Sequence, residues 1–278
     1  MNSYSIEKSQ NTKPAGVAEE TREVAEVKAQ IYLAKQFPRD MNIVVGSILQ
    51  ECRNPRLAEM AQYSFVKGKG DKATEIKGPS IRLMEVIARH WGNCDCSLTE
   101  VERRQNGSTV KVRFWDFETN AQQSKIFDVD FVRNTRNGSY VVTDEREKYE
   151  IMASNGARRL RACMQAGIPS YIVDQAVEAC ESTLINANKG KSIEDVRNSM
   201  LEAFIGLADW VTPEILGNVV NKDFEAVTYQ DIVKMRSLYN AIKDGFVKPE
   251  QAFGKESEDL PTVEEQDAAE KLNEQLEL

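Results

Sequence analysis

The stretch NGARRLRACMQAGIP, residues 155–169, carries three arginines within four positions and ends on residues that stop a helix. Small and apolar residues recur here and just upstream at the 3.6-residue spacing of a helix with one buried face. We therefore predict one long helix, capped by Thr143 and packed against a core. Its buried stripe is Tyr149, Met152, Ala153, Gly156, Leu160, Cys163, Met164 and Gly167.

The three arginines lie outside or at the edge of that stripe. Arg158 and Arg161 are expected on the far side of the helix and Arg159 at its margin, with no carboxylate one helical turn away. Guanidinium groups held this close repel one another unless an anion or a tertiary acid meets them. Because arginine matches phosphate in a bidentate fork, we predict a phosphate-facing role. A tertiary salt bridge or plain solvation is the alternative.

The segments before this helix are rich in strand-forming residues. Turn signals at Asn106-Gly107, Thr119-Asn120 and Asn137-Gly138 separate SLTEVER, TVKVRFW, SKIFDVDFV and SYVV, which predicts a four-stranded antiparallel meander. A two-residue loop at Asn106-Gly107 would place Lys111 opposite Glu102 and Arg113 opposite Glu100 as cross-strand charge pairs.

Helices are expected on both sides of the meander. GPSIRLMEVIARHWGN reads as a helix in which Arg82 and Arg89 flank Glu85 at pairing distance. The fold class is thus α+β: an antiparallel β-meander flanked by helices, with a small C-terminal helical module. The predicted division is a flexible tail (1–20), an α+β core (21–187), the module (188–254) and an acidic tail (255–278). The NANKGKS segment reads as a linker, and Ser192, Thr212 and the Thr228–Asp231 capping box read as helix starts beyond it. Residues 189–278 are expected to be dispensable for DNA binding, and their removal should leave a soluble core.

Charge is distributed unevenly along the chain. The net charge is -8, yet residues 67–161 contain 18 Lys and Arg against 14 Asp and Glu. A basic middle between acidic ends is typical of a chain that meets a polyanion locally. Besides the helix arginines, the candidate nucleic-acid-binding cations are Lys67, Lys69, Lys72, Lys77, Arg133 and Arg136.

Most catalytic classes find little support in the sequence. His90 is the only histidine, and neither a CxxC pair nor a Walker or Rossmann glycine pattern occurs, so we expect no metal, cofactor or catalytic residue. The one enzyme alternative is a magnesium-dependent nuclease of the Asp…ExK type, built on Asp40, Glu75 and Lys77. The absence of a signal segment or an apolar span favours a cytoplasmic protein.

The order of helix, antiparallel meander and long basic helix resembles phage-type single-strand annealing proteins, the broad group that includes RecT, Erf and Redβ. The likeness covers about residues 64–187. It is most specific in GARRLRACMQAGI, where Arg158, Arg159 and Arg161 match the basic helix after the sheet.

The resemblance implies a non-catalytic, phage-encoded recombination and repair protein that anneals complementary single-stranded DNA without ATP in a bacterial host's cytoplasm. It further implies a ring-shaped or helical homo-oligomer with DNA in a continuous basic groove. A 5′-3′ exonuclease and the host single-strand binding protein are the implied partners. Trp115, Phe117 or Tyr140 would be available for base stacking, although aromatic residues in strands more often belong to the core.

Overall fold

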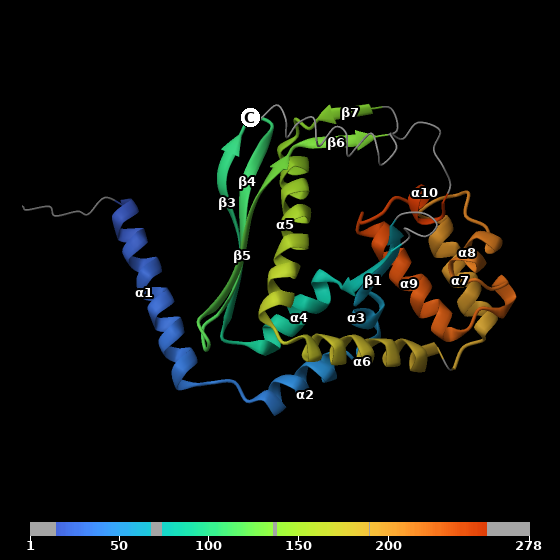
Figure 1. Ribbon diagram of the computed structural model, residues 1–278, viewed down its shortest axis with the longest axis horizontal. Coiled ribbons are helices and arrows are strands. Elements are labelled where there is room, and N and C mark those ends of the chain that lie inside the picture. Colours follow the sequence, from blue (N-terminus) through green and yellow to red (C-terminus); the bar gives the residue numbers. More distant parts are fainter. Residues whose placement is uncertain (1–14, 68–73, 136–137, 189, 255–278) are drawn as a thin grey trace, which may run out of the picture.

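The computed structural model describes residues 15–67, 74–135, 138–188 and 190–254 (Figure 1). Helix α1 (Ala15–Gln36) is followed by α2 (Met41–Glu51) and the short α3 (Pro55–Glu59). Helix α1 begins earlier than Thr21, so part of the predicted flexible tail is helical. Asp40 begins α2 as its N-cap, with Oδ1 accepting a hydrogen bond of 2.8 Å from the amide of Asn42.

The chain after α3 forms an antiparallel pair of strands. Strands β1 (Gln62–Lys67) and β2 (Thr74–Pro79) pair along their length, and the residues between them lie outside the described part of the chain. Helix α4 (Ile81–Trp91) follows. Its N-cap is Ser80, and it ends at Gly92 and Asn93, both with positive φ, as expected from a Gly-Asn stop.

The predicted meander has three strands instead of four. Strands β3 (Cys94–Arg104), β4 (Gly107–Asp116) and β5 (Ala121–Asp130) form one antiparallel sheet, while β6 (Val132–Thr135) and β7 (Gly138–Val141) form a separate hairpin. The division has a simple cause. Strand β4 begins at Gly107, opposite Asp130, so the chain beyond Asp130 has no partner in the larger sheet. The ring of Phe131 is buried at this point.

The register between β3 and β4 also differs from the prediction. The hairpin loop is Gln105-Asn106, because Arg104 pairs with Gly107, and a bulge follows between Glu100 and Glu102. Lys111 therefore lies opposite Thr99 and Arg113 opposite Ser97, so both predicted charge pairs are wrong. Arg113 is still neutralised from β3, where Asp95 accepts from its Nη2 at 2.8 Å.

Helix α5 (Glu145–Gly167) packs across one face of the three-stranded sheet, and α6 (Ser170–Asn188) follows it. Asp144, not Thr143, caps α5 by accepting from the amide of Glu147. The predicted stripe holds for Met152, Gly156, Cys163 and Met164, which are buried. Tyr149 is largely exposed, so the prediction that it belongs to the buried stripe is wrong.

The main core lies between α5, the sheet and the helices around it. Its fully buried side chains include Ile48 of α2, Leu83 of α4, Phe114 of β4, Met164 of α5 and Ile172 of α6. The other face of the sheet carries the alternating, partly exposed residues of β4, such as Lys111 and Arg113. One buried and one solvated face is the usual arrangement of an antiparallel sheet.

The C-terminal module has a second core. It comprises α7 (Ile193–Ile205), α8 (Pro213–Val219), the 3-10 turn η2 (Phe224–Ala226), α9 (Tyr229–Lys243) and α10 (Pro249–Ala252). The predicted helix starts at Ser192, Thr212 and Thr228 are confirmed. This core is not built from the module alone, because Tyr63, Phe65 and Ile76 of the β1–β2 hairpin pack into it. The module is therefore attached to the rest of the fold by packing as well as by the linker.

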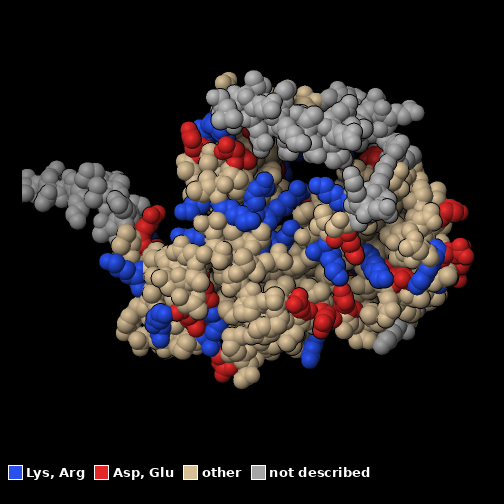
Figure 2. Space-filling model, in the orientation of Figure 1, with Lys and Arg blue, Asp and Glu red and all other residues tan. Residues whose placement is uncertain are grey.

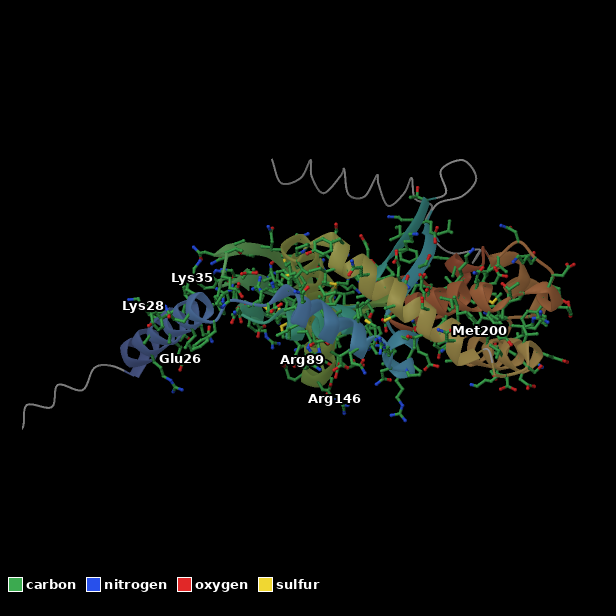
Figure 3. All side chains as sticks on the ribbon, turned by 90° about the horizontal axis from the view of Figure 1, so that it is seen from below. Glu26, Lys28, Lys35, Arg89, Arg146 and Met200 are labelled. Carbon is green, nitrogen blue, oxygen red and sulfur yellow. The ribbon has the colours of Figure 1, made fainter. Side chains whose placement is uncertain are left out.

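Helix α1 stands at the opposite end of the molecule from the module. Figure 3 labels Glu26, Lys28 and Lys35 along α1 at one end and Met200 of α7 at the other. Among residues 22–36 only Ala34 is buried. No helix in the described part of the chain is long and apolar enough to span a lipid bilayer.

Candidate nucleic-acid interface

Arg158 caps the C-terminal end of another helix. Its Nη2 donates to the carbonyl oxygens of Asp244 at 2.9 Å and Gly245 at 2.8 Å, just past the last turn of α9. Carbonyls at a helix C-terminus lack partners within their own helix, and a cation there also meets the negative end of the helix dipole. Burial lowers the pKa of Arg158 below its usual value. This arginine thus fastens α5 to the module.

Arg161 is buried against aromatic rings. Only 9% of the residue is exposed, and its guanidinium carbon lies 4.4 Å from the ring centre of Tyr63 and 4.9 Å from that of Phe246. These two rings stack on each other at 4.4 Å with an angle of 7° between their planes. Burial lowers the pKa of Arg161. Cation–π contact with desolvated rings is the interaction that holds the charge here.

The far side of α5 is therefore an internal contact. The residues Tyr63, Arg82, Arg158, Arg161, Asp244, Gly245 and Phe246, which we call the α5–α9 junction, link α5 to the module. Arg82 contributes an ion pair of 3.2 Å with Asp244, and not the predicted pairing with Glu85. The expectation that Arg158 and Arg161 form a phosphate-facing surface is corrected by this geometry, because Arg158 is bonded to the module and Arg161 is covered.

Arg159 points the other way, toward the edge of the sheet. Its guanidinium carbon lies 4.1 Å from the ring centre of Phe127 on β5, and Nη1 donates to Asn155 at 3.2 Å. The side chain is half-buried. Arg159 keeps nitrogen donors that these contacts do not use, since a guanidinium carries five N–H groups.

Lys125 lies at the same edge of the sheet as Arg159. It precedes Phe127 by two residues on β5, so both side chains lie on the face of the strand that α5 covers. Cys163 follows Arg159 by one helical turn. Burial raises the pKa of the Cys163 thiol, and the positive charge of Lys125 partly offsets this rise, so Lys125 lies near this part of α5. We call Lys125, Phe127 and Arg159 the α5–β5 seam. Within the described residues, no carboxylate lies within 4 Å of either cation of the seam.

Figure 2 shows a band of Lys and Arg side chains across the middle of one face of the molecule, over the sheet and α5 and on toward the module. Strand β5 is an edge of the three-stranded sheet, and six consecutive residues from Ala121 to Ile126 are exposed. An extended ligand therefore has access along the seam.

The remaining predicted cations are dispersed. Lys67 and Lys77 are exposed on the β1–β2 hairpin, opposite Thr74 and Ser64. Arg133 on β6 is 3.6 Å from a carboxylate oxygen of Glu147. Lys69, Lys72 and Arg136 lie outside the described residues.

The residues of the nuclease alternative are engaged separately. Asp40 caps α2, and Glu75 of β2 accepts a hydrogen bond of 2.7 Å from Ser64. Lys77 lies on the same strand as Glu75. In the described part of the chain, no three His, Cys, Asp or Glu side chains are grouped so that they could hold a metal ion.

Sequence reasoning missed Lys125 and Phe127, although a signal for both was present. Alternation along SKIFDVDFV places Lys125, Phe127 and Val129 on one face of a strand. A lysine on the same face as two apolar residues marks the border of a packed surface, where its stem is covered and its ammonium reaches water.

Comparison with known proteins gives no further assignment: no family model, no curated protein and no solved structure matches the chain.

Proposed function

We propose that this protein binds single-stranded DNA along the α5–β5 seam and anneals complementary strands without ATP. The observation that carries the proposal is the pair Lys125 and Arg159, two cations on one accessible seam without a carboxylate partner in the described residues. Phosphate neutralisation by Lys and Arg supplies most of the affinity of sequence-independent DNA binding.

The seam suits backbone binding better than reading of bases. Phe127 is covered by Arg159, so its ring is not free to stack on a base. The exposed side chains that continue along β5 are Gln122, Gln123 and Ser124, which are uncharged. A strand held by its phosphates keeps its bases turned outward, and annealing requires bases that remain available for pairing.

The test is the salt dependence of DNA binding. If Lys125 and Arg159 each neutralise one phosphate, the double variant Lys125→Gln, Arg159→Gln should flatten the slope of log affinity against log salt by about 1.4, or about 0.7 per contact. The loss should be equal for all sequences, and annealing of complementary oligonucleotides should slow in parallel. Circular dichroism would confirm that the double variant folds.

Arg113→Gln is the matched control. Arg113 lies on the opposite face of the sheet and is already paired with Asp95, so its removal should leave the slope unchanged. An unchanged slope in the double variant, or a larger effect from Arg113→Gln, would place the DNA elsewhere. Shortening of a labelled strand in the presence of magnesium would instead favour the nuclease alternative.

Assembly belongs to the same proposal. The resemblance to phage annealing proteins leads us to expect a homo-oligomer in which neighbouring seams form one groove, working with a 5′-3′ exonuclease and a host single-strand binding protein. Light scattering with and without single-stranded DNA would give the mass of the assembly. A monomer under both conditions would contradict this part of the proposal.

A further inference from the structure

The last 24 residues hold nearly all of the chain's net charge. Residues 255–278 contain nine acids and two lysines, a net charge of -7, whereas the whole chain carries -8. Residues 1–254 together therefore carry only -1. A segment of this charge density resembles a short polyanion in its electrostatics, and it is attracted by the same surfaces that attract DNA.

The segment is long enough to reach the seam. It follows Gly254, just after α10. Twenty-four residues span up to about 80 Å when fully extended. A compact chain of 278 residues has a radius of gyration of about 19 Å, so this reach exceeds the size of the folded part. Chain length therefore places no barrier between the module and the α5–β5 seam.

We propose that residues 255–278 bind the α5–β5 seam of their own chain and compete there with DNA. The proposal deepens the function given above and shares its site. Lys125 and Arg159 are suited to this role because, among the described residues, no carboxylate neutralises them, and Lys125 is exposed. Arg104, Arg113 and Arg133 are less suited, because each already meets a carboxylate.

Competition within one chain needs only weak contacts. A tethered ligand meets its site at an effective concentration in the millimolar range, so a few solvent-exposed charge pairs suffice. Such pairs are screened by salt, so the tail should occupy the seam at low ionic strength and leave it as salt rises. The tail would then suppress weak, non-specific binding while a longer DNA strand displaces it.

The first experiment needs no DNA. A zero-length carbodiimide activates a carboxylate, and the amine of a lysine in contact with it displaces the urea to form an amide. Mass spectrometry of the full chain identifies the joined residues. We expect Lys125 to be linked to acids of residues 255–278 at low salt and the link to disappear at high salt. Lys111, on the opposite face of the sheet, is the control and should remain unlinked.

The second experiment measures DNA affinity. In the full chain, all nine acids are replaced by Gln or Asn. If the tail occupies the seam nine-tenths of the time, its neutralisation should tighten binding of single-stranded DNA about tenfold at low salt. The gain should vanish at high salt and in the Lys125→Gln, Arg159→Gln background.

The outcomes separate this inference from the proposed function. Links to Lys125 without any DNA binding would support the tail contact and contradict the function. DNA binding that depends on the seam, with no link to Lys125, would support the proposed function and contradict the tail contact. Links from Lys125 to residues 255–278 that occur only in a band at twice the chain mass would overturn binding within one chain, and so would links to Lys111 of equal yield.

Discussion

At the residue scale, Gly156 sets how closely α5 approaches the sheet. A Cβ atom at this position would lie 1.9 Å from Cδ1 of Leu98 on β3, far inside van der Waals contact. Gly156→Ala must therefore push α5 away or displace Leu98, and overpacking of this kind costs about 1–3 kcal/mol. We expect a loss of that size in the free energy of unfolding, measured by denaturant titration.

Gly46→Ala is the matched control for this substitution. Gly46 also lies inside a helix, but nothing is within 4 Å of its Cβ position. Alanine should there stabilise α2 by up to about 1 kcal/mol through helix propensity alone. If both substitutions changed the free energy of unfolding equally, Leu98 could move aside without cost, and the close approach of α5 to the sheet would not matter for stability.

Individual residues also show where sequence reasoning stops. The small residues of α5 predicted a packed face, and Gly156 lies on it, because periodicity is a local property. The partners of Arg158 and Arg161 are Phe246 and the end of α9, more than 80 residues away in the chain. No local pattern distinguishes an arginine that meets a distant carbonyl from one that meets a phosphate.

Arg39 is a second example of a role without a local signal. Its Nη1 lies 2.7 Å from Asp116, its backbone amide donates to Glu118 at 2.9 Å, and its guanidinium covers the ring of Trp91. Burial alone would raise the pKa of the Asp116 carboxyl. The hydrogen bonds that this carboxyl accepts, including the one from Arg39, outweigh burial and lower its pKa. No local pattern around Arg39 indicates these partners, because Asp116 and Glu118 lie more than 75 residues away in the chain.

At the element scale, the start of α9 depends on one buried carboxylate. Asp231 accepts from the amide of Thr228 at 2.9 Å and from its hydroxyl at 2.7 Å, and it pairs with Lys222. The capping box was predicted from the sequence because its partners are three residues apart. Burial would raise the pKa of Asp231, but the bonds from Lys222 and Thr228 outweigh it and lower the pKa to about 2.

This shift predicts how the module responds to acid. An unfolded Asp has a pKa of about 3.9, so the stabilisation is fully present above that value and is lost as pH falls toward about 2. It amounts to about 2–3 kcal/mol at neutral pH. Asp231→Asn should remove it, so urea titrations of wild type and variant should differ at pH 7 and converge toward pH 2. Asp223→Asn, outside the capping box, is the control. A constant difference at all pH values would assign the effect to packing.

Element boundaries were easier to predict than pairing between elements. Caps and stops at Ser192, Thr212, Gly92 and Thr228 are chemical signals confined to one turn. The bulge between Glu100 and Glu102 has no such signal, yet it shifts every pair in the β3–β4 hairpin beyond it. Register depends on which face is buried by α5, which is a tertiary property.

At the scale of the whole molecule, the module and the core share a surface. Tyr63, Phe65 and Ile76 belong to the β1–β2 hairpin but complete the core of the module, and Tyr63 stacks on Phe246. The NANKGKS segment predicted a tethered, removable unit. Composition identifies a linker but does not show whether the units that it joins also pack against each other.

Removal of residues 189–278 should therefore destabilise what remains. The truncated chain would expose Tyr63, Phe65 and Ile76, at about 1.5–3 kcal/mol for each large apolar side chain, and would leave Arg161 without the ring of Phe246. We expect aggregation or a broad thermal transition, with binding of a hydrophobic dye. A chain ending at Gly254, which loses only the acidic tail, is the control and should unfold sharply. The chain that lacks residues 189–278 could instead stay soluble and unfold as sharply as the control. In that case the α5–α9 junction contributes little to stability, and the prediction of a removable module is correct.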